Sequence, residues 1–340
     1  MSSSTSEAAA EFARRRQSPL QQVQHLLHAR PWLSPLVILV LTYAIFGALD
    51  QRVVAPGAIS SNLQQTAVVA ALAIGQTLII LTAGIDLAVG ATAILAMMVM
   101  ATLAADKTLP GPLAILVGIA LAVAAGYLNG ILITRVNLPP FIVTLGTLSI
   151  FTAIALLYSG GSSIIGSDMP GIMTWMGNTF GPQKFQITYG LVVVVLLYAV
   201  VGFILSQTAW GRHVYAVGDD PESARLSGVP SKRILVAVYS LAGLIYGIAA
   251  WILIGRTGAA TPNAVGNMNL ETITAVVIGG TSLFGGRGTL IGTALGALIV
   301  NTFGQALAIM GVNFQWRVLA TGILVIVAVS VDQWIRKVKA

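Results

Sequence analysis

Ten long apolar runs divide the sequence and constrain its fold more than any other feature. They cover residues 32–49, 64–83, 88–105, 112–134, 141–159, 187–206, 234–254, 270–283, 290–310 and 314–332. Most approach the length of about 20 residues that an α-helix needs to cross a bilayer. A backbone in lipid must satisfy its own hydrogen bonds, and these runs lack the alternation of barrel strands. The predicted fold class is therefore an all-α polytopic membrane protein with about ten transmembrane helices.

Charge content excludes a soluble protein. Only 9% of the residues are charged and 56% are hydrophobic, whereas soluble domains carry about 25% charged residues. The apolar surface that these few charges cannot cover must therefore face membrane lipid. The net charge of +7 does not indicate a nucleic-acid partner, because the basic residues are scattered between apolar runs. The chain has no cysteine, which excludes disulfides and thiolate metal sites.

The distribution of Lys and Arg predicts the orientation. With ten crossings and a cytoplasmic N-terminus, thirteen of the eighteen basic residues fall inside. The five on the outer side are Arg52, Lys107, Lys184, Arg256 and Arg317. This asymmetry predicts that both termini are cytoplasmic. Three regions follow: a membrane domain at 32–333, a basic cytoplasmic tail at 334–340, and an N-terminal segment at 1–31 that forms either a tail or a surface helix.

Glycine-rich breaks interrupt two of the apolar regions. One is Gly84–Gly90, between the second and third runs, and the other is Gly279–Gly286, in the eighth run. Such interrupted segments are typical of broken or re-entrant helices that line a cavity. The topology also runs helices 2–5 and 7–10 in opposite directions, which indicates a possible inverted repeat.

An inner loop at 207–233 carries the signals of a short helix. Asp219 or Asp220 can cap a helix that begins at Pro221, with Glu222 in its first turn, and Gly228 is placed to end it. This helix would lie at the cytoplasmic surface and present Arg225 and Leu226. It is either a solvated connector or a docking helix for a cytoplasmic partner.

Two of the eleven acids, Asp86 and Glu271, fall in or beside apolar runs. Buried carboxylates are costly and usually face a cavity or a partner group. For both residues, contact with a transported solute and a role in starting a helix remain open. Uncharged polar side chains within the runs are further candidates for lining a path, or for bonding neighbouring helices: Gln76, Asn129, Thr144, Asn301 and Gln305. Gly292, Gly296 and Gly304 are predicted to be helix-packing sites.

No catalytic or nucleotide-binding pattern is present. The turn Gly285-Gly286-Arg287-Gly288 lacks the lysine and hydroxyl of a phosphate-binding P-loop. No metalloprotease or nucleophile-elbow motif occurs. We expect no catalytic residue, no metal ligand and no cofactor in this chain, which is therefore not predicted to be an enzyme.

Four motifs in order resemble the permease subunits of ATP-binding-cassette monosaccharide importers, the branch with ribose, galactose, xylose and fructose systems. They are Gly84–Gly90, Leu138–Gly146, the 207–233 loop and Ile273–Gly286, and the resemblance extends from Leu36 to Asp332. The terminal Asp332–Lys337 looks most like fructose-type permeases. Two positions depart from the family pattern. Asp220 stands where many relatives have Asn, and Ala88 replaces a Ser, so any hydroxyl role there is in doubt.

The resemblance implies a function and partners. It implies a subunit of the bacterial inner membrane that translocates a monosaccharide by alternating access, with fructose favoured and ribose, mannose, xylose or galactose as other candidates. Its partners would be a cytoplasmic ATPase that uses ATP and Mg²⁺, a periplasmic sugar-binding protein and a second permease copy, most simply in a homodimer. The residues implied to couple to the ATPase are Gly218, Asp219, Glu222, Ala224, Arg225, Leu226 and Gly228.

Two other classes remain to be considered. A stand-alone transporter driven by an ion gradient needs an ionisable relay within the membrane, and only Asp86 and Glu271 could supply it. A membrane-embedded enzyme would need a paired acid and base or a metal site, which the sequence does not assemble.

Overall fold

The computed structural model describes residues 32–264 and 268–337. Each predicted apolar run coincides with a helix, which confirms the all-helical polytopic fold. These helices are α3 (Leu33–Leu49), α4 (Pro56–Leu81), α5 (Val89–Ala105), α6 (Gly111–Arg135), α7 (Pro140–Ser159), α9 (Tyr189–Gln207), α12 (Ser231–Thr257), α13 (Met268–Ile278), α14 (Leu290–Ile309) and α15 (Phe314–Lys337). Among the described residues, α4, α6, α7, α9, α12 and α14 are long and apolar enough to span a membrane. The number of ten crossings stays a prediction.

Three predicted boundaries differ clearly from the structure. Helix α4 begins at Pro56, not near 64, because its polar first turns find partners: the Asn62 amide donates to the Thr302 hydroxyl at 2.6 Å. Helix α13 ends at Ile278, before the glycines at 279–280. Helix α15 continues through Lys337, into the predicted tail. The predicted N-terminal segment 1–31 lies outside the described residues.

The two long connections contain structure of their own. The 207–233 segment holds α10 (Ala209–Asp219) and α11 (Pro221–Leu226), of which the sequence predicted only the second. The outer connection and its neighbours hold eight short elements, among them antiparallel pairs of β1 with β4 and of β2 with β3. These are η1 (Gln51–Val54), β1 (Ile164–Ile165), η2 (Gly166–Asp168), α8 (Gly171–Thr174), η3 (Trp175–Gly177), β2 (Thr179–Phe180), β3 (Ile187–Thr188) and β4 (Ala259–Ala260).

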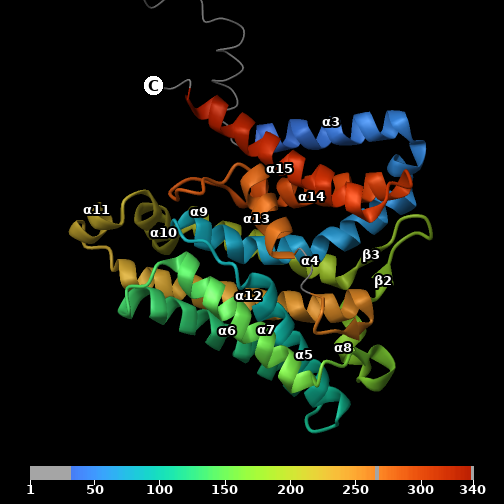
Figure 1. The fold of residues 1–340 in the computed structure, drawn as a ribbon, viewed down its shortest axis with the longest axis horizontal. Helices are drawn as coiled ribbons and strands as arrows, with labels where there is room; N and C mark the ends of the chain where they lie inside the picture. Colours follow the sequence, from blue (N-terminus) through green and yellow to red (C-terminus); the bar gives the residue numbers. More distant parts are fainter. Residues whose placement is uncertain (1–31, 265–267, 338–340) are drawn as a thin grey trace, which may run out of the picture.

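The helix packing has the pattern of two interleaved repeats (Figure 1). Helix α12 packs against α5 and α6, as α4 packs against α13 and α14. Within the first repeat (α4–α7), α5 contacts α6 and α7. Within the second (α12–α15), α13 likewise contacts α14 and α15. Exchanging α4–α7 for α12–α15 preserves these contacts. The first turns of α5 and α13 also meet, because the Gly90 backbone N–H donates to the Asn269 side chain at 2.8 Å. The packing agrees with the predicted repeat.

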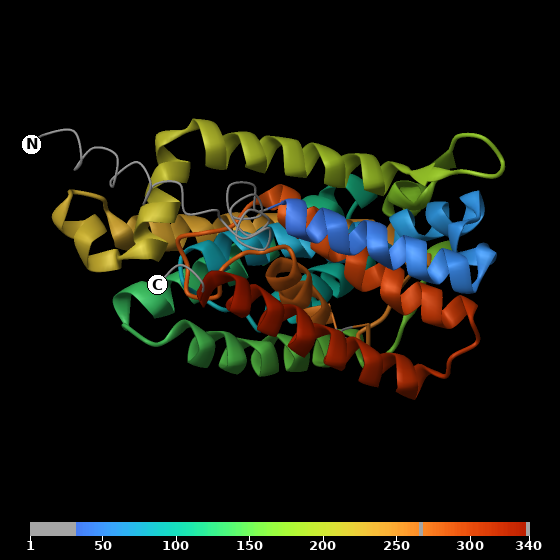
Figure 2. The same cartoon turned by 90° about the horizontal axis from the view of Figure 1, so that it is seen from above.

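The helices run between two ends of the molecule, here named the α11 end and the α8 end after the short helices found there. Helix α4 ends near α10, and α12 begins directly after α11, so these two central helices run in opposite directions. Helix α3 begins and α15 ends on the side of α11 (Figure 2). The described part of the chain therefore enters and leaves the bundle at the same end, as the predicted topology requires.

Burial separates central from peripheral helices. In the most apolar 18-residue window of α4, 83% of the residues are buried, against 28% in α7 and 22% in α9. Large apolar side chains such as Leu157, Phe203 and Ile326 are exposed on the peripheral helices. Since such surface is disfavoured in water, it marks the face that meets lipid or another protein chain.

Candidate functional site

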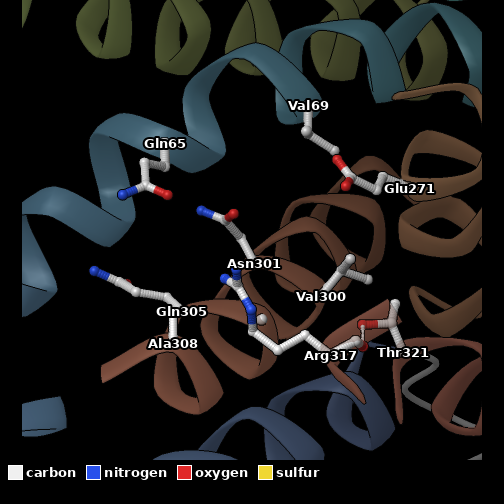
Figure 3. A pocket seen from close by; sticks show the side chains of 10 residues that line it. Gln65, Val69, Glu271, Val300, Asn301, Gln305, Ala308, Arg317 and Thr321 are labelled. Atoms are coloured by element: carbon white, nitrogen blue, oxygen red, sulfur yellow. Dashed lines mark hydrogen bonds between the residues drawn. The ribbon is translucent and has the colours of Figure 1, made fainter. Parts of the chain in front are cut away.

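A cavity of about 400 Å³ opens between α4, α13, α14 and α15 (Figure 3). It lies in the half of the bundle toward the α8 end, beside the final turns of α14. Three residues predicted to line a path meet there: Glu271, Asn301 and Gln305. The remaining lining residues are Gln65, Val69, Val300, Gly304, Ala308, Arg317 and Thr321. We call this cavity the polar pocket.

Side-chain amides of the polar pocket bond α14 to α4. The Asn301 Nδ2 group donates to the Asn62 backbone carbonyl at 3.1 Å and to the Thr66 hydroxyl at 2.8 Å. The Gln305 Nε2 group donates to the Ala58 carbonyl at 3.1 Å. These bonds hold two amides of α14 in fixed orientations on one wall of the pocket.

Two charged side chains face the polar pocket from different helices. Arg317 extends from α15 toward Asn301 and Gln305, and Glu271 lies across the cavity on α13 (Figure 3). The Arg317 Nε atom is buried and has no hydrogen-bond partner among the described residues. Its guanidinium carbon lies 5.6 Å from the centre of the Phe314 ring. The pocket wall thus holds a buried N–H donor that the described residues leave unpaired.

Sequence reasoning missed three polar residues of the pocket: Gln65, Arg317 and Thr321. Arg317 was placed among the outer basic residues that orient the chain. A signal did exist, because Arg317 lies within an apolar run, where a charge is costly. Only the packing of α15 beside α14 shows that this charge turns inward.

The other four predicted path residues do not line the polar pocket. Thr144 donates to the Ile85 carbonyl at 3.0 Å and so ties α7 to the break before α5. Asp86 is buried, and its carboxylate accepts the Ala88 N–H at 2.7 Å, which supports the helix-start interpretation. Gln76 and Asn129 are buried, away from this cavity.

Helix α11 is capped at both ends. Asp220, rather than Asp219, caps the N-terminus by accepting the Glu222 and Ser223 backbone N–H groups at 3.0 and 3.1 Å. The hydrogen bond from the Ser223 hydroxyl lowers the pKa of Asp220, and the two backbone hydrogen bonds lower it further. At the C-terminus, Gly228 has φ +83° and donates to the Arg225 carbonyl, as in a Schellman motif. The predicted cap, start and end of this helix are confirmed.

The outer face of α11 is open. Arg225 and Glu222 form an ion pair at 2.6 Å, and both side chains are mostly exposed. Their mutual hydrogen bond raises the pKa of Arg225 and lowers that of Glu222. Leu226 is 75% exposed, and Phe284 at the same end of the bundle is 84% exposed. Large apolar side chains at such exposure mark a surface suited to contact with lipid or with another protein chain.

Gly218 and Ala224 are buried, so neither belongs to this outer face. Gly218 lies where α10 meets the end of α4 and the 285–286 turn. A Cβ at position 218 would overlap the Leu81 carbonyl oxygen and lie 2.7 Å from the Gly286 nitrogen. The same Gly286 N–H donates to the Leu81 carbonyl at 3.0 Å. We call this three-way contact the backbone junction.

The backbone junction and the polar pocket are connected by the same helices. Helix α4 runs from Gln65, at the pocket, to Leu81, at the junction. Helix α14 begins just beyond Gly288, whose carbonyl accepts the Tyr215 hydroxyl at 3.0 Å, and ends at the pocket. Helix α10 therefore contacts the end of α4 and Gly288, just before α14, and both helices form walls of the polar pocket.

Comparison with known proteins gives one matching family and several similar permeases. A family model described as "Branched-chain amino acid transport system / permease component" matches residues 58–329. The fructose import permease protein FrcC of Rhizobium meliloti is 46% identical over 325 residues, which are 94% of this chain and 90% of that protein. The ribose import permease protein RbsC of Bacillus subtilis is 36% identical over 88% of this chain and 92% of its own length. The galactose/methyl galactoside import permease protein MglC of Escherichia coli is 34% identical, with coverage of 87% and 92%.

An all-helical polytopic bundle whose sequence matches this family over most of its length is a membrane permease. The chain belongs to the permease family of ATP-binding-cassette importers, in the branch whose members include sugar permeases. It is a multi-pass protein of the inner membrane. The resemblance drawn from the sequence motifs is confirmed.

Proposed function

We propose that this chain is the membrane-spanning subunit of an ATP-driven importer that moves a monosaccharide by alternating access. Fructose is favoured, ahead of ribose, mannose, xylose and galactose, because the fructose permease is the most similar of the relatives named above. The observation that carries the mechanism is the connection between the backbone junction and the polar pocket by α4 and α14.

The mechanism starts at α11. A cytoplasmic ATPase docks on the face formed by Arg225, Leu226 and Phe284, and it binds ATP and Mg²⁺, so this chain needs no cofactor. Closure of the ATPase displaces α11 and α10. Because Gly218 lies against the Leu81 carbonyl, a movement of α10 toward α4 pushes on the end of α4. The pocket walls then shift, which opens the sugar site to one side of the membrane and then the other.

Two further partners complete the importer. A periplasmic sugar-binding protein delivers the substrate at the α8 end, near the polar pocket. A second copy of this chain forms the other half of the pathway in a homodimer. Membrane lipid covers the remaining apolar faces. In this arrangement the delivering protein contributes most of the affinity, and the permease contributes a weak site that releases the sugar.

Transport by the reconstituted complex tests the proposal. The chain, its ATPase and its binding protein are placed in proteoliposomes, and uptake of labelled fructose is measured with and without ATP. We expect uptake to require ATP hydrolysis and to survive an uncoupler. Uptake without the ATPase that collapses with the uncoupler would instead establish the ion-driven transporter, which no observation here favours.

Docking is tested separately by removing the exposed apolar side chains. We expect Leu226→Ala and Phe284→Ala each to weaken association with the ATPase about tenfold, the effect of losing most of one buried apolar side chain. Ser227→Ala, on the same exposed surface, is the matched control. Unchanged association in both apolar variants would contradict docking at this face.

A further inference from the structure

Three exposed cations lie where α6 ends and α12 begins. Helices α6 and α12 lie side by side (Figure 1), and a Cβ at Gly130 would be 3.0 Å from the Val236 Cα. Arg135 follows Gly130 by five residues, and Lys232 precedes Val236 by four. Because a helix rises about 1.5 Å per residue, Arg135 and Lys232 reach nearly the same level at the α11 end. We call Arg135, Lys232 and Arg233 the basic patch.

The charges of the basic patch are not neutralised within the described part of the chain. All three side chains are exposed, and none forms an ion pair with a described residue. The acids of the neighbouring short helices are engaged elsewhere. Asp220 caps α11, Glu222 pairs with Arg225, and Asp219 lies against the 285–286 turn. The basic patch therefore presents three positive charges to an external partner.

Helix stability does not explain these positions. Lys232 and Arg233 lie in the first turn of α12, which contains no acidic residue. The positive end of the helix dipole disfavours cations in a first turn. Arg135, in the last turn of α6, does suit its own helix. Two cations at an unfavourable position indicate that something outside the helix uses their charge.

Exposed apolar side chains adjoin the basic patch. The chain after Arg135 exposes Val136 at 56%, Phe141 at 50% and Ile142 at 57%. Phe141 and Ile142 lie in the first turn of α7, so this apolar surface continues along a peripheral helix. Cations beside exposed apolar side chains are typical of a surface at the level of lipid headgroups. A small soluble anion would use the cations alone.

We propose that the basic patch binds the phosphate of an anionic phospholipid, in the leaflet that surrounds the α11 end. The acyl chains of this lipid lie along Val136, Phe141 and Ile142. Arginine grips a phosphate with two parallel N–H groups, and lysine adds a point charge. A zwitterionic lipid brings its own cation to the patch and binds more weakly. The inference does not depend on which solute the chain transports.

Lipid retention by the purified full chain tests the proposal. The chain in mild detergent is titrated with phosphatidylglycerol or phosphatidylcholine, and bound lipid is measured by native mass spectrometry. We expect phosphatidylglycerol to bind about tenfold more tightly. Glycerol 3-phosphate carries the phosphate without the acyl chains, so it should not displace the bound lipid.

Charge variants locate the headgroup. Lys232→Gln/Arg233→Gln should weaken retention of phosphatidylglycerol about 25-fold, as for two charges lost near an anionic surface. Lys232→Arg/Arg233→Lys keeps both charges and should retain the lipid. Lys107→Gln/Lys184→Gln is the matched control, because it removes two exposed charges near the α8 end, and it should change nothing.

Apolar variants locate the acyl chains. Phe141→Ala removes part of the apolar surface beside the basic patch and should weaken retention about fivefold. Leu157→Ala is the matched control, because Leu157 is exposed on the same helix but near its other end. It should retain the lipid normally.

The outcomes separate a lipid from other partners. Equal retention of the two lipids, displacement by glycerol 3-phosphate, or equal loss in the Lys107 and Lys184 control would each overturn the inference. Association with the ATPase is measured with the same variants. If Lys232→Gln/Arg233→Gln loses the ATPase and keeps the lipid, the basic patch is a protein contact and the inference is wrong.

Discussion

At the scale of single residues, Gly218 has no side chain and so allows the backbones of α10 and α4 to touch. It was predicted to belong to a surface segment that contacts a partner, yet it is buried against the Leu81 carbonyl. Close approach of backbones requires a residue without a Cβ. The role of Gly218 is therefore to let α10 pack against α4, and it does not belong to the exposed face of this segment.

Replacing Gly218 with Ala should separate ATP hydrolysis from transport. The added Cβ would overlap the Leu81 carbonyl oxygen, so α10 must shift away from α4, at a cost of about 1–3 kcal/mol. We expect about tenfold lower fructose uptake per ATP hydrolysed while the ATPase still copurifies. Gly146→Ala, where a Cβ meets nothing within 4 Å, should leave the ratio unchanged.

The hydrogen bonds of the Asp220 cap lead to a second prediction at this scale. Asp220→Ala leaves the Glu222 and Ser223 N–H groups without their acceptor, so α11 should fray and ATPase association should fall about fivefold. Asp220→Asn, which keeps an acceptor oxygen, should bind normally. The comparison is made by titrating labelled permease with the ATPase. Equal loss in both variants would show that the charge matters and the cap does not.

The pH dependence of the same cap follows from the sign of its pKa shift. The pKa of Asp220 is lowered in the folded chain, so its contribution is present above the ordinary value of 3.8 and is lost as pH falls through the lowered value. Between pH 7 and pH 5, this carboxylate should cause no change in ATPase association.

At the scale of helices, small residues decide which pairs touch most closely. Gly126 and Gly130 on α6 face α12, and Gly243 and Gly247 on α12 face α6. Both pairs have the four-residue spacing of transmembrane packing motifs. A Cβ at Gly243 would overlap the Ala122 carbonyl, and one at Gly126 would overlap the Tyr239 carbonyl. This contact joins the two halves of the bundle.

Gly243→Ala should therefore weaken the bundle. The added methyl meets backbone atoms, which cannot turn aside as a side chain can, so we expect a loss of about 1–3 kcal/mol. The readout is the apparent melting temperature of the detergent-solubilised chain. Gly146→Ala on α7 is the control, because its Cβ points into open space. Equal melting temperatures for the two variants would contradict the packing argument.

Among the glycines predicted to pack, two are confirmed and one is wrong. A Cβ at Gly292 would overlap the Gly279 carbonyl, and one at Gly296 would overlap the Ala275 carbonyl. A Cβ at Gly304 would meet nothing within 4 Å, and Gly304 lines the polar pocket. All three lie on α14 at spacings that suit helix packing, so the pattern alone could not distinguish a close contact from a cavity wall.

At the scale of the whole molecule, the two ends of the bundle carry different features. The α11 end carries the backbone junction and the exposed Leu226, and the polar pocket opens in the other half. If the basic residues orient the chain as predicted, the α11 end is cytoplasmic. An importer needs this polarity, because the ATPase and the delivered sugar reach the permease from opposite sides.

Orientation can be measured with single thiols, since the chain has no cysteine. Ser227 follows α11, and Ser167 lies in η2 near the α8 end, and both are exposed. We expect an impermeant maleimide to label Ser227→Cys only in inside-out vesicles and Ser167→Cys only in right-side-out vesicles. Labelling of both from one face would refute the predicted topology.

The sequence alone determined the class of fold and the family. Apolar length and scarcity of charge leave helices in a membrane as the stable solution, and both signals are local. The cap at Asp220 and the helix stop at Gly228 were predictable for the same reason. Four motifs in a fixed order then carried the family resemblance.

Only the tertiary structure decided which polar residues share a cavity. Gln76, Asn129 and Asn301 look alike in the sequence, since each is an amide in an apolar run. Asn301 lines the pocket because α14 lies beside α4 and α15, whereas Gln76 and Asn129 are buried elsewhere. Helix rotation and neighbours are set by long-range packing, which residue type and spacing within one helix do not specify.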